Sequence, residues 1–578
     1  MQIAPATIPV ELSGLTGQPK GIAVMLVDRQ AVVFTDRSPG RWTADAVALT
    51  VLVLTLAAFA AAAITRRSDL TSGGWFLFAD QGMNLLFTQQ LLEGRSLYAD
   101  IAYPYGPVSA YAYTAFAAIL KPSVFSYHLY FAVTSIAAMI AAYALFRGVT
   151  SPPVALLVVV VAILPTMLVP GSLLGGSSNA PYITLERILL LGLALAWTPP
   201  GSRNPRRAIV LGTLLVAWQA TKFGGAFFAG AAVVLLDLVG LHIDRWTRPA
   251  VVRWIQSSAI TLVTFVAGEG VLIAGAYLTL PPAIAAEVVW PVHVLESYRM
   301  YPSSAAGLQF TDVRLVVGQY LTPLFGALLG AIFVVALAGK RGDALPNRDW
   351  RWLRLLLPPL FFLVGAVGYF RQTWHFEQAM WTLAIPVALV ALVRQRSMRL
   401  AGLALTLPCF ALVIKAMFVT RPDASLVNLA LPNGERLKVR AEMRKQVTDI
   451  VAELRQATGD DSGRSRGVYV VPAGGGLNYF YGLAAPARQH WFLTAFVRPH
   501  DENRMRDLLS AGPSTFVIRR YGRGEPGAAD PCAWIDPPIF SRSFCSALAP
   551  RLSVRTRMGN DLTLFDVRPV SAEETRFR

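Results

Sequence analysis

Two carboxylates, Asp80 and Asp100, stand in a polar, aromatic-rich stretch, residues 75–107, that directly follows the first long apolar run. Ionisable groups held between membrane-length runs are rare and usually functional. Residues 80–94 carry apolar side chains at helical spacing, which predicts an amphipathic helix lying along the membrane interface. Asp80 would stand at the start of this helix, where the helix dipole keeps a carboxylate ionised. The residues alone leave two interpretations of Asp80 open, a helix cap and a catalytic base.

Three basic or titratable residues in other short segments between apolar runs could bind an anion. Lys222 lies in QATKFGG, at the turn of a predicted helical hairpin, and Arg371 and His375 lie in YFRQTWHFEQ. Arginine can hold phosphate oxygens in a bidentate manner, and histidine can hydrogen-bond phosphate or sugar. The alternatives are that Lys222 only reaches toward the interface from a span end, and that the second segment belongs to the aromatic belt of the membrane.

Further acids lie near or within later apolar runs. Glu186 directly precedes Arg187, so a local pair between them is the simpler prediction. Glu269 lies inside an apolar run, where an acid is either functional or paired with a buried partner such as Lys222. The loop 281–314 is long enough to order over a bound ligand, as lids do. A divalent metal site formed by His293 and the acids of this loop stays open, but their spacing is not specific for a metal.

The elements that must position these residues are membrane spans. The chain has 578 residues, of which 54% are hydrophobic and only 15% charged, whereas a soluble protein carries about a quarter charged residues. Runs of bilayer length recur, which predicts a polytopic α-helical membrane protein with about 11–12 spans. The first span is predicted at 44–64. Later runs fall near 124–146, 153–170, 183–198, 207–221, 224–241, 254–280, 315–338, 352–370, 377–394 and 401–419.

Basic loops set the predicted orientation. The segments 198–207, 241–253, 340–351 and 394–399 are rich in arginine, and such loops collect on the cytoplasmic side. They account for most of the net charge of +17, and the chain shows no basic stripe with interleaved aromatics that would suggest nucleic acid.

This orientation places residues 1–43 in the cytoplasm, the first loop 65–107 outside, and everything after residue 420 outside. Lys222, Arg371 and His375 then lie on the same outer face as Asp80. Residues 107–120 stay open, because they could form a tilted or re-entrant helix or a further span.

The region 421–578 differs from the transmembrane module 44–420, because charged residues, glycine and proline become more frequent. It is predicted to form a small extracytoplasmic α/β domain. Its predicted elements are helices at 434–456 and about 501–511, strands at 466–472 and 515–520, and a glycine-rich loop at 473–482. Cys532 and Cys545 would form a disulfide there or remain free thiols.

The order of the features around Asp80 is itself a pattern. It runs from the first span to Asp80-Gln81-Gly82, then Leu91-Leu92-Glu93-Gly94, Tyr98, Asp100 and finally Tyr103-Pro104-Tyr105-Gly106-Pro107. Together with the span number and the outer C-terminal region, this pattern resembles the GT-C superfamily of membrane glycosyltransferases over most of the chain. The resemblance implies a polyprenyl-phosphate-linked sugar donor and a catalytic acid in the first outer loop, which matches Asp80. The common motif is Asp-Glu, and Gln81 departs from it.

The resemblance also implies roles for the other candidate residues. The Lys-aromatic-Gly-Gly turn of Lys222 and the Arg-x-x-x-His pattern of Arg371 and His375 are similar to family segments, which implies contacts to the donor phosphate. Glu186 is the nearest match to a second acid of some members, in a different register. The remaining predicted substrate-binding residues are Gln81, Asp100, Tyr103 and Tyr105.

The predicted function is transfer of a hexosyl or pentosyl unit from a polyprenyl-phosphate donor to an acceptor hydroxyl, in glycan biosynthesis of the cell envelope. Asp80 would take the acceptor proton as general base, and the leaving phosphate would need positive charge rather than a second acid. A single displacement implies inversion. The acceptor, a glycan, a lipid or a protein, stays open, and no cofactor beyond the lipid-linked donor is predicted. The Ala- and Arg-rich composition suggests the inner (plasma) membrane of a bacterium.

Two other classes of function remain as alternatives. A secondary transporter or flippase of a lipid-linked sugar should show internal hydropathy symmetry and broken spans, and the sequence shows no such repeat. A non-catalytic assembly factor would not need the polar residues gathered at 75–107. The sequence contains no P-loop, which argues against ATP-driven transport by this chain.

Overall fold

The computed structural model describes residues 43, 45–54, 57, 77, 80–159, 181–289, 350–358, 360, 361, 364, 426–458, 467–471, 474–483, 499–511, 514–519, 544, 547–558 and 562–568. The chain divides into two units, Met1–Val47 and Ala48–Arg578, and the elements below belong to the second. The predicted spans at 315–338, 377–394 and 401–419 lie outside the described residues, as do Arg371, His375 and all three cysteines.

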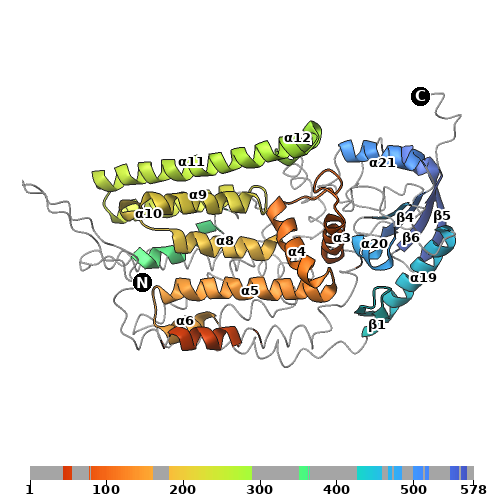
Figure 1. Ribbon diagram of the computed structural model, residues 1–578, viewed down its shortest axis with the longest axis horizontal. Helices are drawn as coiled ribbons and strands as arrows, with labels where there is room; N and C mark the ends of the chain where they lie inside the picture. Colours follow the sequence, from red (N-terminus) through yellow and green to blue (C-terminus); the bar gives the residue numbers. More distant parts are fainter. Residues whose placement is uncertain are drawn as a thin grey trace, which may run out of the picture. The chain divides into compact units, whose positions relative to one another are not determined.

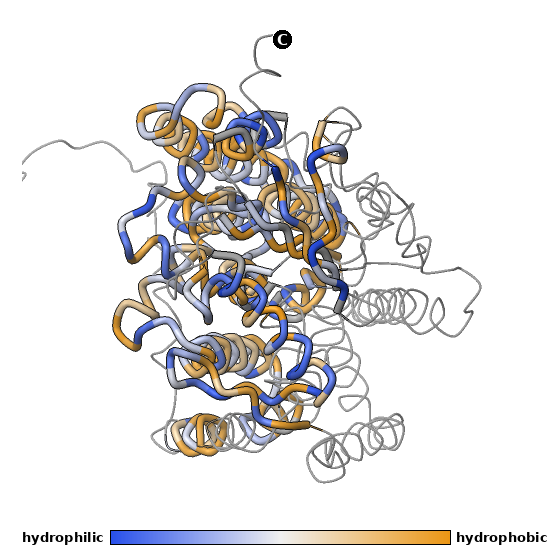
Figure 2. The backbone as a smooth tube through the Cα atoms, turned by 90° about the vertical axis from the view of Figure 1, so that its right-hand side faces the viewer, coloured by the Kyte–Doolittle hydropathy of each residue, from blue (hydrophilic) through white to orange (hydrophobic). Residues whose placement is uncertain are grey.

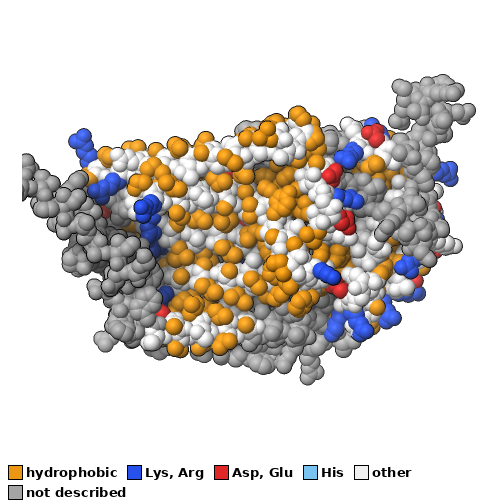
Figure 3. Space-filling view, in the orientation of Figure 1, with side chains coloured by type: hydrophobic (Ala, Val, Ile, Leu, Met, Phe, Trp, Pro, Cys, Tyr) orange, Lys and Arg blue, Asp and Glu red, His pale blue; other side chains and the backbone are white. Residues whose placement is uncertain are grey.

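Within the described residues, three helices are long and apolar enough to cross a membrane: α5 (Val124–Arg147), α10 (Gly225–Ile243) and α11 (Arg248–Thr279). The shorter helices α8 (Tyr182–Ala196) and α9 (Pro205–Gln219) run beside them (Figure 1). Apolar side chains cover the face over these helices, and Lys and Arg gather toward the helix ends (Figure 3). This distribution is typical of helices whose sides face lipid and whose ends face water.

Small residues bring α9 and α11 close together. A Cβ added at Gly212 of α9 would lie 2.6 Å from the Thr264 Cβ, and one at Gly268 of α11 would lie 2.4 Å from Val216 Cγ2. The Thr261 hydroxyl of α11 also donates to the Ala208 carbonyl of α9 at 3.1 Å. Close helix approach through glycine, joined by hydroxyl hydrogen bonds, is how helices associate in lipid.

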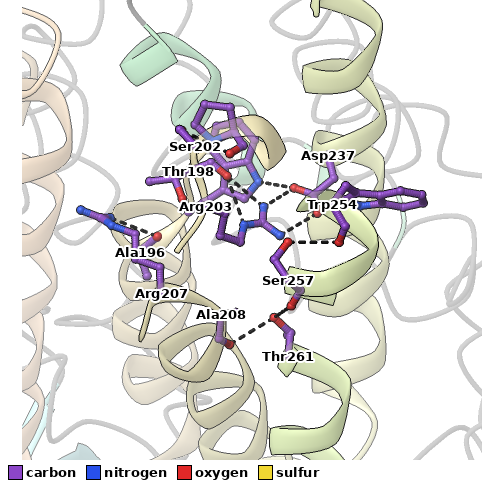
Figure 4. A network of polar contacts seen from close by, with 12 residues as sticks. Ala196, Thr198, Ser202, Arg203, Arg207, Ala208, Asp237, Trp254, Ser257 and Thr261 are labelled. Carbon is purple, nitrogen blue, oxygen red and sulfur yellow. Dashed lines mark hydrogen bonds and ion pairs between the residues drawn. The ribbon is translucent and has the colours of Figure 1, made fainter. Parts of the chain in front are cut away.

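A buried polar network joins the C-terminal ends of α8 and α10 to the start of α9 (Figure 4). The Arg203 guanidinium forms an ion pair with Asp237 of α10 and donates to the Thr198 carbonyl at 2.9 Å. The Trp197 indole donates to the same carboxylate at 2.7 Å. Both side chains of the ion pair are almost fully buried, so each needs the other's charge.

The segment 107–120 forms helix α4 (Pro107–Leu120), and its two ends lie at one end of the bundle. At its start, the Val108 N–H donates to the Ala220 carbonyl in the α9–α10 turn at 2.8 Å. At its end, Lys121 leads directly into α5. Fourteen residues rise about 21 Å, and α4 runs across the neighbouring helices in Figure 1 rather than along them. The question left by the sequence is thus answered, because α4 is a crossing helix and not a further span.

Helix α3 (Asp80–Leu92) differs from the amphipathic interface helix that the sequence predicted. Met83, Leu85 and Phe87 are buried, but so are the polar Gln81 and Gln90, so no side of the helix is uniformly exposed. Helix α4 packs on it, as does α20 (Gly475–Tyr481) of the C-terminal region. The prediction was wrong because the residue pattern of a helix cannot show that a segment nearly 400 residues away packs on it, as Gly475 does beside Met83 and Leu86.

The C-terminal region contains an antiparallel hairpin, β1 (Leu426–Ala430) and β2 (Arg436–Arg440), followed by α19 (Ala441–Thr458). Its main sheet has the order β3-β4-β6-β5, with β3 and β4 parallel and the other pairs antiparallel. The strands are β3 (Gly467–Val471), β4 (Ser514–Arg519), β5 (Leu552–Met558) and β6 (Leu562–Val567). Other described elements include α6 (Pro152–Val158), α12 (Pro282–Val289), α21 (Pro499–Ala511) and the 3-10 helices Pro200–Ser202, Trp350–Leu356 and Ala549–Arg551.

The predicted fold class, helical with membrane-length apolar helices and a small C-terminal α/β region, is confirmed. Two local predictions were wrong. Residues 436–440, predicted as helix, form strand β2, and residues 475–481, predicted as loop, form helix α20. In Figure 2 the C-terminal elements face the viewer and alternate hydrophilic with hydrophobic stretches, as expected of elements with one buried side. Strand β2 shows this directly, because Leu437 and Val439 are buried between exposed neighbours.

Candidate functional site

The candidate site begins where the Tyr-Pro-Tyr-Gly-Pro segment meets the turn between α9 and α10. The Gly106 N–H donates to the Thr221 carbonyl at 3.2 Å, beside the Val108 bond to Ala220. A Cβ at position 106 would lie 2.1 Å from the Ala220 carbonyl oxygen, so only glycine allows the two backbones to approach this closely. Two segments more than 100 residues apart, both selected from the sequence as functional candidates, are therefore hydrogen-bonded neighbours.

A line of tyrosines joins this segment to Lys222. The Tyr103 and Tyr105 ring centroids are 5.6 Å apart in an edge-to-face arrangement, and the Tyr105 ring lies 4.2 Å from that of Tyr182. The Lys222 Nζ lies 4.8 Å from the centroid of Tyr182, within the range of a cation–π contact. The structure thus brings together three predicted site residues, Tyr103, Tyr105 and Lys222.

Glu186 is the acid of this cluster. Its Oε2 lies 3.6 Å from the Lys222 Nζ, and its Oε1 accepts a hydrogen bond from the Trp218 indole at 3.0 Å. Lys222 and Glu186 keep 19% and 18% of their side-chain surface exposed, so a ligand can reach both.

The ion pair between Glu186 and Lys222 was not predicted from the sequence. Glu186 of α8 forms this pair with the α9–α10 turn, and its charge also acts on the neighbouring Arg187 guanidinium. Glu269 lies partly buried on α11 and does not pair with Lys222, whose carboxylate partner comes from α8.

Asp100 forms two hydrogen bonds within its own turn. Its carboxylate accepts from the Ser96 N–H at 2.9 Å, and its N–H donates to the Ser96 carbonyl at 2.9 Å. Within this turn Tyr98 has a φ of 67°, a left-handed conformation that is uncommon for a tyrosine. The Tyr98 hydroxyl donates to the Tyr105 carbonyl at 2.6 Å. The turn therefore fixes the backbone of Tyr105, and the Asp100 side chain remains exposed at its edge.

Asp80 is the first residue of α3, and Gln81 follows it in a buried position. Two turns along the same helix, Phe87 packs edge-to-face on Tyr103 with ring centroids 5.6 Å apart. Seven residues of helix rise about 10 Å. Helix α3 thus connects the backbone of Asp80 to the tyrosine line through Phe87.

The other candidate residues are placed only in part. Arg371, His375 and most of the loop 281–314 lie outside the described residues. Among the residues that are described, no group of three or more His, Cys, Asp or Glu side chains is arranged to hold a metal ion.

Sequence reasoning missed Tyr182, Trp218 and Tyr98 as members of this site. Tyr182 and Trp218 stand at the ends of α8 and α9, where aromatic residues ordinarily anchor a span at the interface, so their types gave no distinct signal. Tyr98 belonged to the quoted motif, but its left-handed backbone could not be read from its residue type.

No family model matches the sequence, and no curated protein matches it significantly. Among solved structures, the chain is similar to the crystal structure of ArnT from Cupriavidus metallidurans bound to undecaprenyl phosphate. The identity is 13% and the TM-score 0.44, over 92% of this chain and 98% of that chain. The apo structure of the same protein gives 11% identity and a TM-score of 0.36, over 89% and 98% of the two chains. With TM-scores below 0.5, neither similarity identifies the function of this chain.

Proposed function

We propose that this chain is a membrane glycosyltransferase that moves a sugar from a polyprenyl-phosphate donor to an acceptor hydroxyl at the outer membrane face. The observation that carries the proposal is the meeting of the Tyr103–Pro107 segment with the Lys222 turn, at the same end of the bundle as α3. A partly exposed cation beside a line of tyrosines, at the ends of membrane-length helices, suits an anion that carries a lipid tail.

Lys222 would bind the phosphate of the donor. The leaving group is a lipid phosphate, which is already a stable anion and gains most from a nearby positive charge as the glycosidic bond breaks. Lysine serves this purpose as a point charge. Arg371 and His375 are proposed to add contacts to the same phosphate, in line with the residue pattern of their segment.

Asp80 would act as the general base. The acceptor hydroxyl must lose its proton as it attacks the anomeric carbon, and a positioned carboxylate can accept it. Glycoside hydrolases need two acids because one of them protonates a poor leaving group, a step that a phosphate leaving group does not require. A single displacement by the acceptor inverts the anomeric centre. Gln81, Asp100, Tyr103 and Tyr105 are proposed to line or support the acceptor side.

A reconstituted transfer assay with a polyprenyl-phosphate sugar tests both roles. We expect Asp80→Asn to lower kcat by about 10²–10⁴-fold, because the acceptor proton loses its base. We expect Lys222→Ala to raise the KM for the donor by roughly 10-fold or more while the KM for the acceptor stays near its wild-type value.

Matched controls come from exposed residues of the C-terminal region, Asp449→Asn and Lys438→Ala, which change the same charges away from the site. Near-normal turnover of a folded Asp80→Asn variant would sink the base assignment. Movement of a lipid-linked sugar across the membrane, without transfer of the sugar to an acceptor, would favour the alternative function, a transporter or flippase.

A further inference from the structure

Glu186 is a fixed anion, whereas Lys222 is the movable partner of the pair. The Trp218 indole anchors one carboxylate oxygen, and the Trp218 ring is fully buried. Gly225 leaves no room behind the carboxylate, because a Cβ there would lie 2.5 Å from the Trp218 Nε1 and 3.3 Å from the Glu186 Oε1. The Lys222 ammonium lies 3.6 Å from the other oxygen, beyond ordinary hydrogen-bond length, on a long flexible side chain. A ligand can therefore draw the ammonium away, but it must still face the carboxylate.

We propose that Glu186 is a specificity-determining residue that favours the monoanionic phosphodiester of the donor over the dianionic phosphate monoester of the product at Lys222. This inference rests on the proposed function, since it takes Lys222 as the phosphate-binding residue. It assigns Glu186 a role by repulsion and not by catalysis.

The charge of the two ligands differs in a way that this pair can detect. A polyprenyl phosphate linked to a sugar is a diester and carries one negative charge. After transfer, the released polyprenyl phosphate is a monoester, whose second pKa near 6 gives about −1.5 to −2 charges at pH 7. The repulsion from a fixed carboxylate grows in proportion to the ligand charge. Glu186 therefore weakens binding of the product more than binding of the donor.

The consequence for turnover is easier product release. A lone lysine would hold the more highly charged monoester more tightly than the diester, and the enzyme would be inhibited by its own product. A carboxylate within 4 Å of the ammonium offsets part of that preference. Specificity of this kind depends on a repulsive element as much as on an attractive one.

The test compares two probes with the same lipid, geranylgeranyl phosphate and its methyl phosphodiester, for binding to the full chain in nanodiscs. The expected change on Glu186→Gln is tighter binding by roughly fivefold per unit of ligand charge. The monoester should thus gain about 10–25-fold and the diester only about fivefold. The amide keeps an oxygen that can accept from Trp218, and Glu186→Asp, which keeps the charge, should retain the wild-type preference between the probes.

Glu93→Gln is the matched control, because Glu93 is an exposed acid directly after α3 and its loss changes the net charge equally without lying beside Lys222. Equal gains of both probes in Glu186→Gln, or weaker binding of both, overturn the inference. The proposed function is tested apart from it by Lys222→Ala. Weaker binding of both probes in that variant leaves the phosphate role standing even when Glu186 does not discriminate. Unchanged binding of both probes overturns the phosphate role and the inference together.

Discussion

Gly106 lets the backbone of the tyrosine segment approach the Lys222 turn closely. Its φ of −67° is available to any residue, so its importance comes from space and not from backbone freedom. A methyl group at this position would lie 2.1 Å from a backbone oxygen, which cannot move aside as a side chain can. The contact between two predicted functional segments therefore depends on one missing Cβ.

We expect Gly106→Ala to lower stability by about 1–3 kcal/mol, as overpacking does, and to raise the KM for the donor because the Tyr105–Tyr182–Lys222 line is displaced. Thermal unfolding in detergent and donor titration measure the two effects. Gly230→Ala is the matched control, since a Cβ there meets nothing within 4 Å and helix α10 should gain slightly from alanine. A Gly106→Ala variant with wild-type stability would show that the two backbones are not in contact.

At the residue scale, the sequence predicted which candidate side chains lie together better than it predicted their ion-pair partners. Lys222, Tyr103 and Tyr105 were selected from residue type and place, and the structure brings them together. The ion-pair partner of Lys222 was not predictable. Residue type indicates that a partly buried lysine needs an acid, but it does not say which helix supplies that acid. That choice depends on how α8 packs against the α9–α10 turn.

Among the elements, α5 shows how the C-terminal region contacts the helices. Ser123 caps α5, accepting from the Ser126 N–H at 2.9 Å, while the Ser126 hydroxyl accepts from the Ser123 N–H at 3.0 Å. The Val124 N–H, also in the first turn of α5, donates at 2.8 Å to the carboxylate of Glu435 in the β1–β2 hairpin. The Tyr479 hydroxyl of α20 donates to the nearby Pro122 carbonyl at 2.6 Å. A carboxylate at a helix N-terminus is stabilised by the helix dipole.

The burial of Glu435 should make the folding stability fall as pH rises. Burial raises the pKa of the Glu435 carboxyl above its ordinary value, and the hydrogen bonds from Val124 and Asn433 lower it only in part. The folded state therefore holds this proton more tightly than the unfolded state, so stability falls as pH rises from the ordinary glutamate pKa of about 4.3 through the raised one.

We expect Glu435→Gln to remove this decline, so that the variant is at least as stable as wild type at pH 7 and the two converge near pH 4. Glu435→Ala should lose about 1–2 kcal/mol, because the Val124 N–H loses its acceptor. The Tm in detergent between pH 4 and 8 measures both effects, with the exposed Glu442→Gln on α19 as control. Parallel pH curves for wild type and Glu435→Gln would contradict the raised pKa.

At the element scale, the helices formed by long apolar runs were predictable from the sequence. Short helices that depend on packing against distant parts of the chain were not. The runs at 124–146 and 254–280 became α5 and α11 because about 20 apolar residues can satisfy their backbone in lipid only as a helix. Helix α20 was missed because it contains two glycines, which disfavour an isolated helix. Gly475 is needed there, since a Cβ would lie 2.9 Å from the Met83 Cα of α3, and tertiary packing outweighed local preference.

In the whole of the second unit, the contacts sort the helix ends into two groups. One group holds the starts of α5 and α8 and the α9–α10 turn, joined by the contacts of Glu435, Tyr182 and Gly106. The other holds the ends of α8 and α10 and the starts of α9 and α11. The Arg203–Asp237 pair joins the α8–α9 connection to α10, and the Arg253 bond to the Gly201 carbonyl at 2.5 Å joins it to α11. The alternation of ends matches the order of spans predicted from the basic loops, while the side of the membrane on which each group lies stays a prediction.

Single-cysteine labelling in intact cells tests that sidedness, in a background where Cys409, Cys532 and Cys545 are replaced by serine. We expect a membrane-impermeant maleimide to label Glu93→Cys and Lys438→Cys without permeabilisation, because both exposed positions belong to the group with the candidate site. Arg206→Cys and Arg248→Cys, exposed at the basic end, should label only after permeabilisation. The reverse pattern would keep the arrangement of helix ends and invert the orientation, which would place Lys222 on the cytoplasmic side. Labelling of Glu93→Cys and Lys438→Cys from opposite faces would contradict the contact between Glu435 and α5 itself.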